Sequence, residues 1–204
     1  MVQLFFLDCS PLLDQLELDR ALPLLDESRR NKVNRFPLAE KKAQCAAVGL
    51  LLRHLFGDVA YRYGENGKPY LANRTDLFFN VSHSGNYVVC AISDTDIGVD
   101  IEVGSAIRPA VMRRCFNTME QEWIDNDSKH FIRLWTMKEA YMKLVGSGLS
   151  LPPIDISLPI SPTNGYDEQN RCWWYLSEWN TPVSLCCDCE QTVEERHITI
   201  KDLL

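Results

Sequence analysis

The sequence has no long apolar run. Its first apolar segment, residues 2–7, ends at the acidic residue Asp8 and has no basic residue before it. A helix needs about 20 apolar residues to cross a membrane, and a secretory signal begins with positive charge, so this segment matches neither. We predict a β-strand there, and we expect a cytoplasmic protein that does not associate with membranes.

The sequence is also poor in positive charge. It carries 21 Lys and Arg against 28 Asp and Glu, and the net charge of −7 argues against a general nucleic-acid binder. Residues 29–42 reverse this balance. Their six basic residues and one acid are Arg29, Arg30, Lys32, Arg35, Lys41 and Lys42 against Glu40. Such a stretch is either the solvated face of a helix or a local anion site, and its composition does not choose between them.

Paired cysteine motifs are nearly absent, although the chain has eight cysteines. Residues 186–189 contain a single C-x-x-C, and no second pair follows at the spacing of a zinc finger. Cys172 and His197 are the only residues that would complete a tetrahedron, and neither has the usual spacing. We favour a strand that uses cysteine as a small hydrophobe, with reduced thiols, over a structural zinc site.

What is present is an alternation of helical and strand patterns without low-complexity segments. Residues 26–56 have helical periodicity with a break near Pro37, and residues 128–145 predict a long helix that ends at Gly146. Further strands are predicted at residues 77–82, 87–93, 97–103, 172–179, 183–189 and 197–200. This order, helix then strands and again helix then strands, predicts an α+β fold of two similar halves that meet near residue 100.

Two carboxylates project from one face of the predicted strand at residues 97–103. Asp100 and Glu102 are two residues apart in an otherwise apolar run, so they point to the same side. Adjacent carboxylates repel and are costly to bury unless a cation compensates them. The pair is therefore either an exposed strand edge or a site for a hard cation such as Mg²⁺.

The long predicted helix carries a third carboxylate. Glu139 and Lys143 are four residues apart and share a face with Trp135, one turn earlier. A surface Glu–Lys pair contributes only about 0.3–0.5 kcal/mol, but a pair beside a large aromatic side chain is less typical of a solvated face. We interpret Glu139 as a third ligand for a metal held by Asp100 and Glu102, with Lys143 close to the anion that the metal binds.

Two further segments are candidates for ligand binding. His83 lies between Ser82 and Ser84 at the end of an apolar strand, where it can face a ligand, although a single His is more often structural. Gly67-Lys68-Pro69 offers a turn with backbone N–H groups and a cation, which is an unspecific anion site. Together the candidates indicate a site that handles a pyrophosphate by positioning and charge neutralisation.

Four motifs in this order resemble the 4′-phosphopantetheinyl transferase superfamily. They are Gly-Lys-Pro at 67–69, Asn-Val-Ser-His-Ser at 80–84, Gly-Val-Asp-Ile-Glu at 98–102 and Trp-Thr-Met-Lys-Glu-Ala-Tyr-Met-Lys at 135–143. The chain length resembles the larger, monomeric type that activates peptide and polyketide synthetases. The resemblance implies a pseudo-twofold fold of two α+β halves. Residues 1–104 would form the coenzyme A side, and residues 105–204 would carry the catalytic helix and the carrier-docking surface.

The resemblance also implies an activity. The enzyme would transfer 4′-phosphopantetheine from coenzyme A to a serine of an apo acyl or peptidyl carrier protein, release 3′,5′-ADP and depend on Mg²⁺. Mg²⁺ is placed on Asp100, Glu102 and Glu139. Coenzyme A is placed with its 3′-phosphate near Arg29, Lys32 and His83, its adenine beside Gly67, Lys68 and Pro69, and its pyrophosphate near Lys143, with Ser82 as a further contact. Glu139 is the candidate base, Lys143 would stabilise the departing phosphate and His83 would orient the nucleotide.

The chain departs from the family pattern at two places. Arg29 stands where Lys is frequent, and it keeps an anion-binding cation. Gln44-Cys45 stands where the family usually has an Arg and a hydroxyl residue. One phosphate contact is therefore expected to be missing or replaced, which would affect the affinity for coenzyme A more than the chemistry.

An apolar stripe is a candidate surface for the carrier protein. Its residues, at the spacing of one helix, are Met112, Phe116, Met119 and Trp123, with Arg108, Arg113 and Arg114 beside them. The stripe either packs into the core or forms a groove for an acidic carrier. Two other functions stay open: a metal-dependent phosphodiesterase with a water nucleophile, and a zinc-stabilised adaptor built on the Cys-rich tail.

Overall fold

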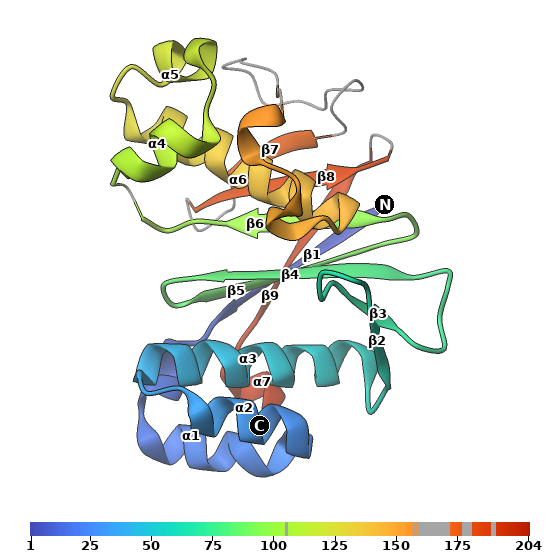
Figure 1. The fold of residues 1–204 in the computed structure, drawn as a ribbon. Helices are drawn as coiled ribbons and strands as arrows, with labels where there is room; N and C mark the ends of the chain where they lie inside the picture. The colour runs from blue at the N-terminus through green and yellow to red at the C-terminus, as the bar shows by residue number, and fades with distance from the viewer. Residues whose placement is uncertain (105, 157, 159–171, 177–180, 189–190) are drawn as a thin grey trace.

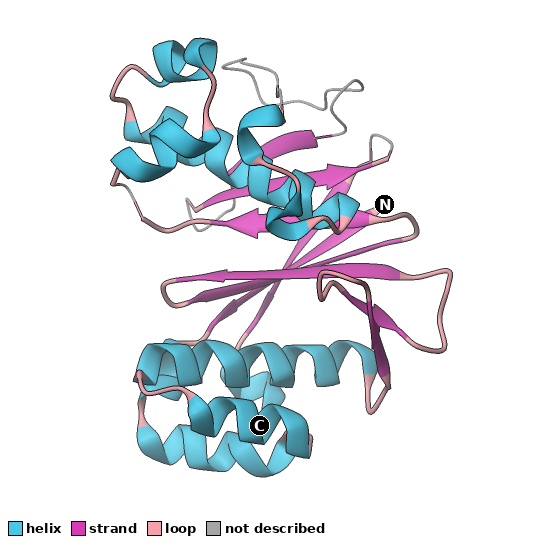
Figure 2. Cartoon of the chain, in the orientation of Figure 1, coloured by secondary structure: helices cyan, strands magenta, loops and turns pink. Residues whose placement is uncertain are grey.

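The computed structural model describes residues 1–104, 106–156, 158, 172–176, 181–188 and 191–204 (Figure 1). In this part of the chain two sheets lie between two groups of helices (Figure 2). The predicted class, a mixture of helices and sheets, is confirmed, while the pseudo-twofold relation of two halves stays a prediction. No helix of the described residues is long and apolar enough to span a membrane.

The first sheet has the strand order β4-β5-β1-β9. Its strands are β1 (Val2–Asp8), β4 (Phe78–Ser84), β5 (Tyr87–Ser93) and β9 (Val193–Ile198). β1 pairs antiparallel with β5 and parallel with β9, and β4 pairs antiparallel with β5. The strands predicted at residues 2–7, 77–82 and 87–93 are confirmed, and β9 begins earlier than the predicted residue 197.

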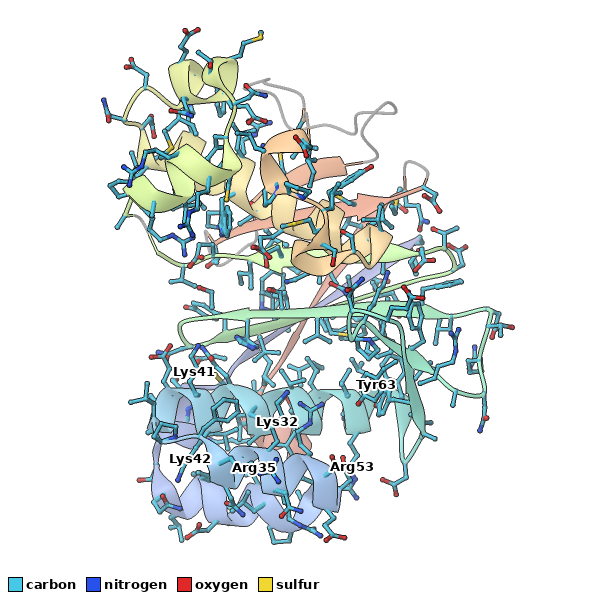
Figure 3. All side chains as sticks on the ribbon, in the orientation of Figure 1. Lys32, Arg35, Lys41, Lys42, Arg53 and Tyr63 are labelled. Atoms are coloured by element: carbon cyan, nitrogen blue, oxygen red, sulfur yellow. The ribbon has the colours of Figure 1, made fainter. Side chains whose placement is uncertain are left out.

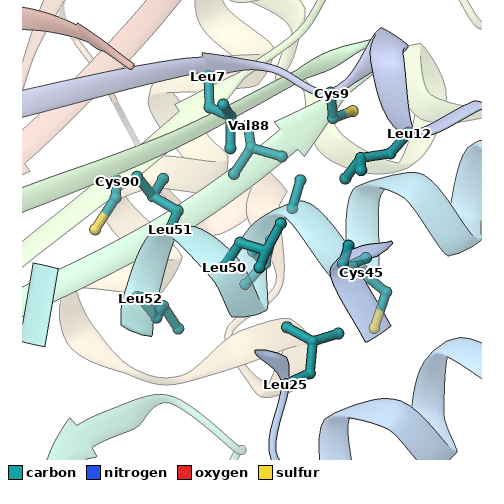
Figure 4. Packing of buried hydrophobic residues seen from close by; sticks show 14 of the residues in the cluster. Leu7, Cys9, Leu12, Leu25, Cys45, Leu50, Leu51, Leu52, Val88 and Cys90 are labelled. Atoms are coloured by element: carbon teal, nitrogen blue, oxygen red, sulfur yellow. The ribbon is translucent and has the colours of Figure 1, made fainter. Parts of the chain in front are cut away.

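Helices cover the outer face of this sheet. They are α1 (Gln15–Ala21), α2 (Glu27–Arg35), α3 (Ala39–Phe56) and α7 (Ile200–Leu203), with the 3-10 turns η1 (Ser10–Leu13) and η2 (Leu22–Leu24). The predicted break near Pro37 is confirmed. Phe36 is extended, because a residue before proline avoids the helical conformation. Figure 4 shows Leu50 and Leu51 of α3 packed against Leu7 of β1 and Val88 of β5.

The second sheet has the order β6-β8-β7 and packs on the inner face of the first. Its strands are β6 (Ile97–Ile101), β8 (Pro182–Cys187) and β7 (Cys172–Leu176). Alternate residues of β1, among them Leu4 and Phe6, are buried with Val99 of β6 and Leu185 of β8. Predicted residues 177–179 and 189 lie outside the described residues. A two-stranded hairpin, β2 (Tyr61–Tyr63) and β3 (Pro69–Leu71), stands beside β4.

The long helix α6 (Ser128–Val145) covers the outer face of the second sheet and has the predicted bounds. It ends at Gly146, whose φ of 66° is left-handed, which favours glycine. Gly98 of β6 lets the helix approach closely, since an added Cβ would overlap the carbonyl of Ala140. The short turns η3 (Gly148–Ser150) and η4 (Pro153–Asp155) follow.

The single helix predicted over residues 108–123 is wrong. The structure has α4 (Pro109–Cys115) and α5 (Thr118–Ile124). Asn117 separates them, because its side chain accepts from the N–H of Glu120 while the Glu120 carboxylate accepts from the N–H of Asn117. The apolar stripe is thereby split: Phe116 is fully buried and Met119 is 70% exposed.

The strand pairing crosses the predicted division at residue 104 in both directions. β6 precedes this residue but pairs with β8, and β9 lies near the C-terminus but pairs with β1. The division into residues 1–104 and 105–204 stays a prediction.

Cysteine serves mostly as a buried apolar residue. Cys9, Cys45, Cys90, Cys115 and Cys187 are free and buried. Cys186 is disulfide-bonded, so the expectation of reduced thiols is wrong at this position. Cys189, the last residue of the C-x-x-C, lies outside the described residues.

Candidate active site

Lys143 lies at the centre of a cluster formed by three elements. Its Nζ atom donates to Asp100 Oδ1 at 2.7 Å, to Ser82 Oγ at 2.8 Å and to the carbonyl of Val99 at 3.1 Å. Ser82 in turn donates to Asp100 Oδ1 at 2.7 Å. Strand β4, strand β6 and helix α6 thus each contribute one side chain, and these three sequence-predicted residues come together.

Asp100 is nearly enclosed, with 7% of its surface exposed. Burial raises the pKa of Asp100, and Lys143 and Ser82 oppose that rise by stabilising the carboxylate. The amide of Asn80, one strand away, accepts from the N–H of Val99 at 3.0 Å and so aligns β6 with β4. The position of the carboxylate is therefore fixed from both neighbouring elements.

Glu102 lies one pleat further along the same face. Ser84 donates to Glu102 Oε1 at 2.8 Å, and Arg108 Nη2 lies 3.4 Å from Glu102 Oε2. The second serine beside His83 therefore has a role that matches the first: each serine of the motif binds one of the two carboxylates on β6.

Glu139 differs from the other two carboxylates. Among the described residues, no hydrogen-bond donor or cation lies within bonding distance of its side-chain oxygens. Burial raises the pKa of Glu139, the charge of Asp100 raises it further, and Lys143 and Arg108 lower it. The helix thus presents a carboxylate without a direct partner to the site.

One cavity of about 420 Å³ brings the predicted catalytic residues together. Its lining includes Ser82, His83, Asp100, Glu102, Arg108, Trp135, Glu139 and Lys143. Among the described residues, the side chains of His, Cys, Asp and Glu do not form a group of three that surrounds one metal position. The chemistry of the donors nevertheless fits a divalent cation, because three carboxylates face one cavity and the pKa of two of them is raised.

A second cavity, of about 510 Å³, is basic. Arg29 and Lys32 from α2, Lys41 from α3 and His83 from β4 line it. The side of α2 and α3 that carries Lys32 and Lys41 is visible in Figure 3. Partial burial among protein atoms lowers the pKa of His83, and the charges of Lys41, Lys143 and Lys32 lower it further, while the side chain stays exposed to the cavity.

The basic cavity adjoins the acidic one. They share Val81 and His83, and a third cavity of about 290 Å³ shares Val81, Glu139 and Lys143 with the acidic cavity. Gly67 and Pro69 line both the basic and the third cavity. The sequence-predicted residues from Arg29 to Lys143 thus line three neighbouring cavities.

Lys68 has a different role from the one its motif suggested. Its Nζ atom donates to Asp96 Oδ1 and to the carbonyl of Leu144, both at 2.9 Å, and its side chain is buried. The N–H of Gly67 donates to the carbonyl of Gly64 at 2.9 Å. The prediction of an anion cradle with a free lysine and free N–H groups is therefore wrong, because these donors are already bonded inside the protein.

Sequence reasoning missed two sets of residues. Lys41 and Gln44 line the basic cavity, and only the local excess of positive charge pointed toward them. Lys138, beside Glu139 on α6, turns away from the site. Its fully buried Nζ atom contacts Glu120 Oε2 at 2.8 Å and the carbonyls of Cys115 and Pro153. A single charged residue in a helical pattern carries no signal for such burial.

Comparisons with known proteins assign the family. The model of the 4′-phosphopantetheinyl transferase superfamily matches residues 96–200. The chain is 32% identical over 153 residues to the 4′-phosphopantetheinyl transferase Sfp of Bacillus subtilis, with 69% of this chain and 68% of Sfp covered. It is 33% identical over 191 residues to the 4′-phosphopantetheinyl transferase HetI of a Nostoc species, covering 81% of this chain and 78% of HetI.

A third relative is the 4′-phosphopantetheinyl transferase ffp of Bacillus subtilis, which is 32% identical over 185 residues, or 83% of this chain and 79% of ffp. The region that the family model matches, residues 96–200, contains strand β6 and helix α6 of the acidic cavity. The chain belongs to the 4′-phosphopantetheinyl transferase superfamily. The prediction of the family, and with it that of a transferase, is confirmed.

Proposed function

We propose that this protein transfers 4′-phosphopantetheine from coenzyme A to the hydroxyl of a serine in an apo acyl or peptidyl carrier protein. In this reaction the serine oxygen forms a bond to the phosphorus that carries pantetheine, and the bond from that phosphorus to the leaving 3′,5′-ADP breaks. The observation that carries the proposal is that the acidic cavity, lined by Glu139 and Lys143, shares Val81 and His83 with the basic cavity.

The basic cavity suits the nucleotide of coenzyme A. Arg29 and Lys32 supply positive charge for the 3′-phosphate, and His83 adds a polar edge that orients the nucleotide. Neither Arg29 nor Lys32 has a carboxylate partner among the described residues, so their charges are available to an anion. We assign the adenine to the backbone and rings of the Gly67-Lys68-Pro69 turn rather than to the Lys68 ammonium.

The acidic cavity suits Mg²⁺. Asp100, Glu102 and Glu139 would hold the ion, which, when bound, neutralises the charge of the pyrophosphate. The raised pKa of Asp100 and of Glu139 supports this assignment, because burial, and to a lesser extent a neighbouring carboxylate, disfavours the charged forms that a bound cation would stabilise. Arg108 and Lys143 already lie on two of the three carboxylates and limit the excess charge.

The protein side chains divide the remaining tasks. We assign Glu139 as the base that takes the proton of the carrier serine, because its carboxylate faces the cavity and has no partner among the described side chains. Lys143 donates to the oxygen of the leaving phosphate, for which Asp100 and Ser82 orient it. Trp135 lines the same cavity beside Glu139 and excludes water from that side.

The proposed function also includes the architecture of the enzyme, its location and the surface on which the carrier binds. We propose a monomeric, cytoplasmic enzyme whose two α+β parts are related by a pseudo-twofold axis, with the active site between them. The carrier docks on the part that contains α4 and α5. Met119 is exposed there, and Arg113 and Arg114 supply positive charge for an acidic carrier.

The direct test uses purified protein, coenzyme A, Mg²⁺ and a panel of apo acyl and peptidyl carriers. We expect mass spectrometry to show a carrier whose mass increases by one phosphopantetheine group, together with release of 3′,5′-ADP. Omission of coenzyme A and a carrier with its serine replaced by alanine are the controls. Hydrolysis of coenzyme A without modification of any carrier would contradict the proposal and indicate a phosphodiesterase.

A further inference from the structure

Lys41 lines the basic cavity and forms a hydrogen bond with Gln44 there. Its Nζ atom donates to Gln44 Oε1 at 2.9 Å, one turn along α3, and both residues line the cavity with Arg29 and Lys32. Among the described residues, no carboxylate lies within ion-pair distance of Lys41. The ammonium group is thus held by a neutral acceptor and keeps its full charge for another anion.

Gln44 is unusually well fixed for a residue at the edge of a cavity. Only 1% of its surface is exposed, and its Nε2 atom donates to the carbonyl of Gly85 at 2.7 Å and to Glu40 Oε1 at 3.3 Å. A carbonyl only accepts hydrogen bonds, so the amide nitrogen of Gln44 must face Gly85 and the amide oxygen must face Lys41. The orientation of the amide therefore follows from the β4–β5 turn.

The surroundings of His83 place the charge of Lys41 inside the site. Of the three lysines that lower the pKa of this imidazole, Lys41 has the largest effect, ahead of Lys143 and Lys32. Lys143 is neutralised by Asp100 at 2.7 Å, whereas Lys41 is not paired with an acid. A residue outside the family motifs thus adds positive charge beside His83 in the basic cavity.

We propose that Lys41 is a further phosphate-binding residue for the 3′-phosphate of coenzyme A and that Gln44 is its positioning residue. This inference rests on the proposed function. The sequence predicted that a phosphate contact is missing or replaced at Gln44-Cys45. In our proposal Lys41 supplies the positive charge for this contact, and Gln44, which has no charge of its own, holds the Lys41 ammonium group in place. Cys45 fills the same wall, with its Sγ atom 4.0 Å from Arg29 Nη1.

Lys42 provides a matched control. It follows Lys41 directly on α3 and has the same charge, but it does not line the basic cavity. Titration calorimetry with coenzyme A and with dephospho-coenzyme A then separates recognition of the 3′-phosphate from all other contacts. We expect Lys41→Ala to weaken the binding of coenzyme A about tenfold, the usual effect of losing one charged hydrogen bond. Dephospho-coenzyme A should bind as before, and Lys42→Ala should change neither affinity.

The role of Gln44 is tested by a double-mutant cycle. Gln44→Met keeps the volume of the side chain and removes its polar atoms, so we expect it to weaken coenzyme A binding. The double variant Lys41→Ala/Gln44→Met should bind no more weakly than Lys41→Ala alone, because the effect of Gln44 passes through Lys41. Lys41→Arg should retain most of the affinity. If Gln44 had a purely structural role, the losses of coenzyme A affinity caused by Gln44→Met and by Lys41→Ala would add up in the double variant.

His83 gives a readout that needs no ligand. In an NMR titration, Lys41→Ala should raise the pKa of His83, and Lys42→Ala should not. Equal losses for the two coenzymes, or equal effects of Lys41→Ala and Lys42→Ala, would overturn the inference. Arg29→Ala and Lys32→Ala are the positive controls and should show the same selective loss. If the unaltered protein did not distinguish coenzyme A from dephospho-coenzyme A, the nucleotide site of the proposed function would itself be wrong.

Discussion

The three carboxylates at the site have three different partners. Asp100 is held by Lys143 and Ser82, Glu102 by Ser84 and Arg108, and Glu139 has no direct partner among the described residues. Their pattern in the sequence predicts that they share a cavity, because residues two apart on a strand share a face. It does not predict the serines, since the packing of β4 in the first sheet against β6 in the second decides which polar residues stand opposite each carboxylate.

Replacement of Asp100 or of Glu139 by alanine is the first test of the proposed metal site. We expect Asp100→Ala and Glu139→Ala to lower the rate of transfer to an apo-carrier at least about 100-fold, because each removes an oxygen ligand for the cation. Glu139→Ala also removes the base. Circular dichroism should show that both variants remain folded. Turnover at the normal rate by either folded variant would contradict the assignment of the site.

The lowered pKa of His83 has a consequence for stability. Its pKa is lowered in the folded protein, so the unfolded chain binds a proton more readily at mildly acidic pH. The contribution of His83 to stability is therefore complete above its ordinary pKa of about 6.5 and is lost as the pH falls through the lowered value. Urea unfolding of the coenzyme-free protein should show this loss, and His83→Gln should reduce it. An unchanged pH profile in His83→Gln would show that the imidazole is not held neutral.

At the scale of the element, α6 lies close to β6 because Gly98 has no side chain. An added Cβ would overlap backbone atoms of Ala140 and Leu144, which cannot rotate away as a side chain would. We expect Gly98→Ala to destabilise the protein by about 1–3 kcal/mol in urea unfolding and to displace Glu139 and Lys143, with loss of transfer. Gly64→Ala is the control, because a Cβ there makes only ordinary contacts. Equal stability of the two variants would contradict this explanation.

The helices differ in how well the sequence predicts them. The bounds of α6 follow from a periodic apolar face and a glycine stop, both of which are local signals. The region of α4 and α5 has an equally periodic stripe, yet a reciprocal pair of side chains at Asn117 and Glu120 ends one helix and starts another. The spacing of apolar residues in the sequence continues across the break, although the structure buries Phe116 and exposes Met119, so periodicity alone does not reveal it.

Met119 is the exposed residue of that divided stripe, and it supplies the test for carrier docking. We expect Met119→Ser to raise the KM for the carrier, while coenzyme A binding stays the same. Because the side chain is 70% exposed, the free energy of unfolding should change by no more than about 0.5 kcal/mol. Glu122→Ser, on the same helix, is a control for a general surface effect. An unaltered KM for the carrier would remove α5 from the docking surface.

At the scale of the whole molecule, Lys68 joins parts that are distant in sequence. Its ammonium group connects the loop before β3 with Asp96 and with the carbonyl of Leu144 near the end of α6. Asn66 adds a bond to the carbonyl of Gly146 at 2.9 Å. The β2–β3 hairpin, which forms part of the wall of the basic cavity, is thereby attached to the helix that carries Glu139 and Lys143. No sequence pattern predicts this, because 76 residues separate Lys68 from Leu144.

Breaking this connection should affect both stability and ligand binding. We expect Lys68→Met to cost about 1–3 kcal/mol, since it leaves a buried carbonyl without its donor, and to weaken coenzyme A and dephospho-coenzyme A equally. The equal loss distinguishes Lys68 from a residue that contacts the 3′-phosphate. Calorimetry with both ligands measures it. A loss confined to coenzyme A would show that the Lys68 ammonium leaves the protein contacts and binds phosphate.

The parallel pairing of β9 with β1 also determines when the molecule can be completed during synthesis. β1 is synthesised long before β9, so one of its two neighbours is made only when residues 193–198 emerge. Until then β1 presents an unpaired edge, which is the kind of surface on which chains aggregate. A nascent chain that stalls before residue 193 therefore contains Glu139, Lys143 and His83, the proposed catalytic residues. It still lacks β9, the strand that pairs with β1 in the first sheet.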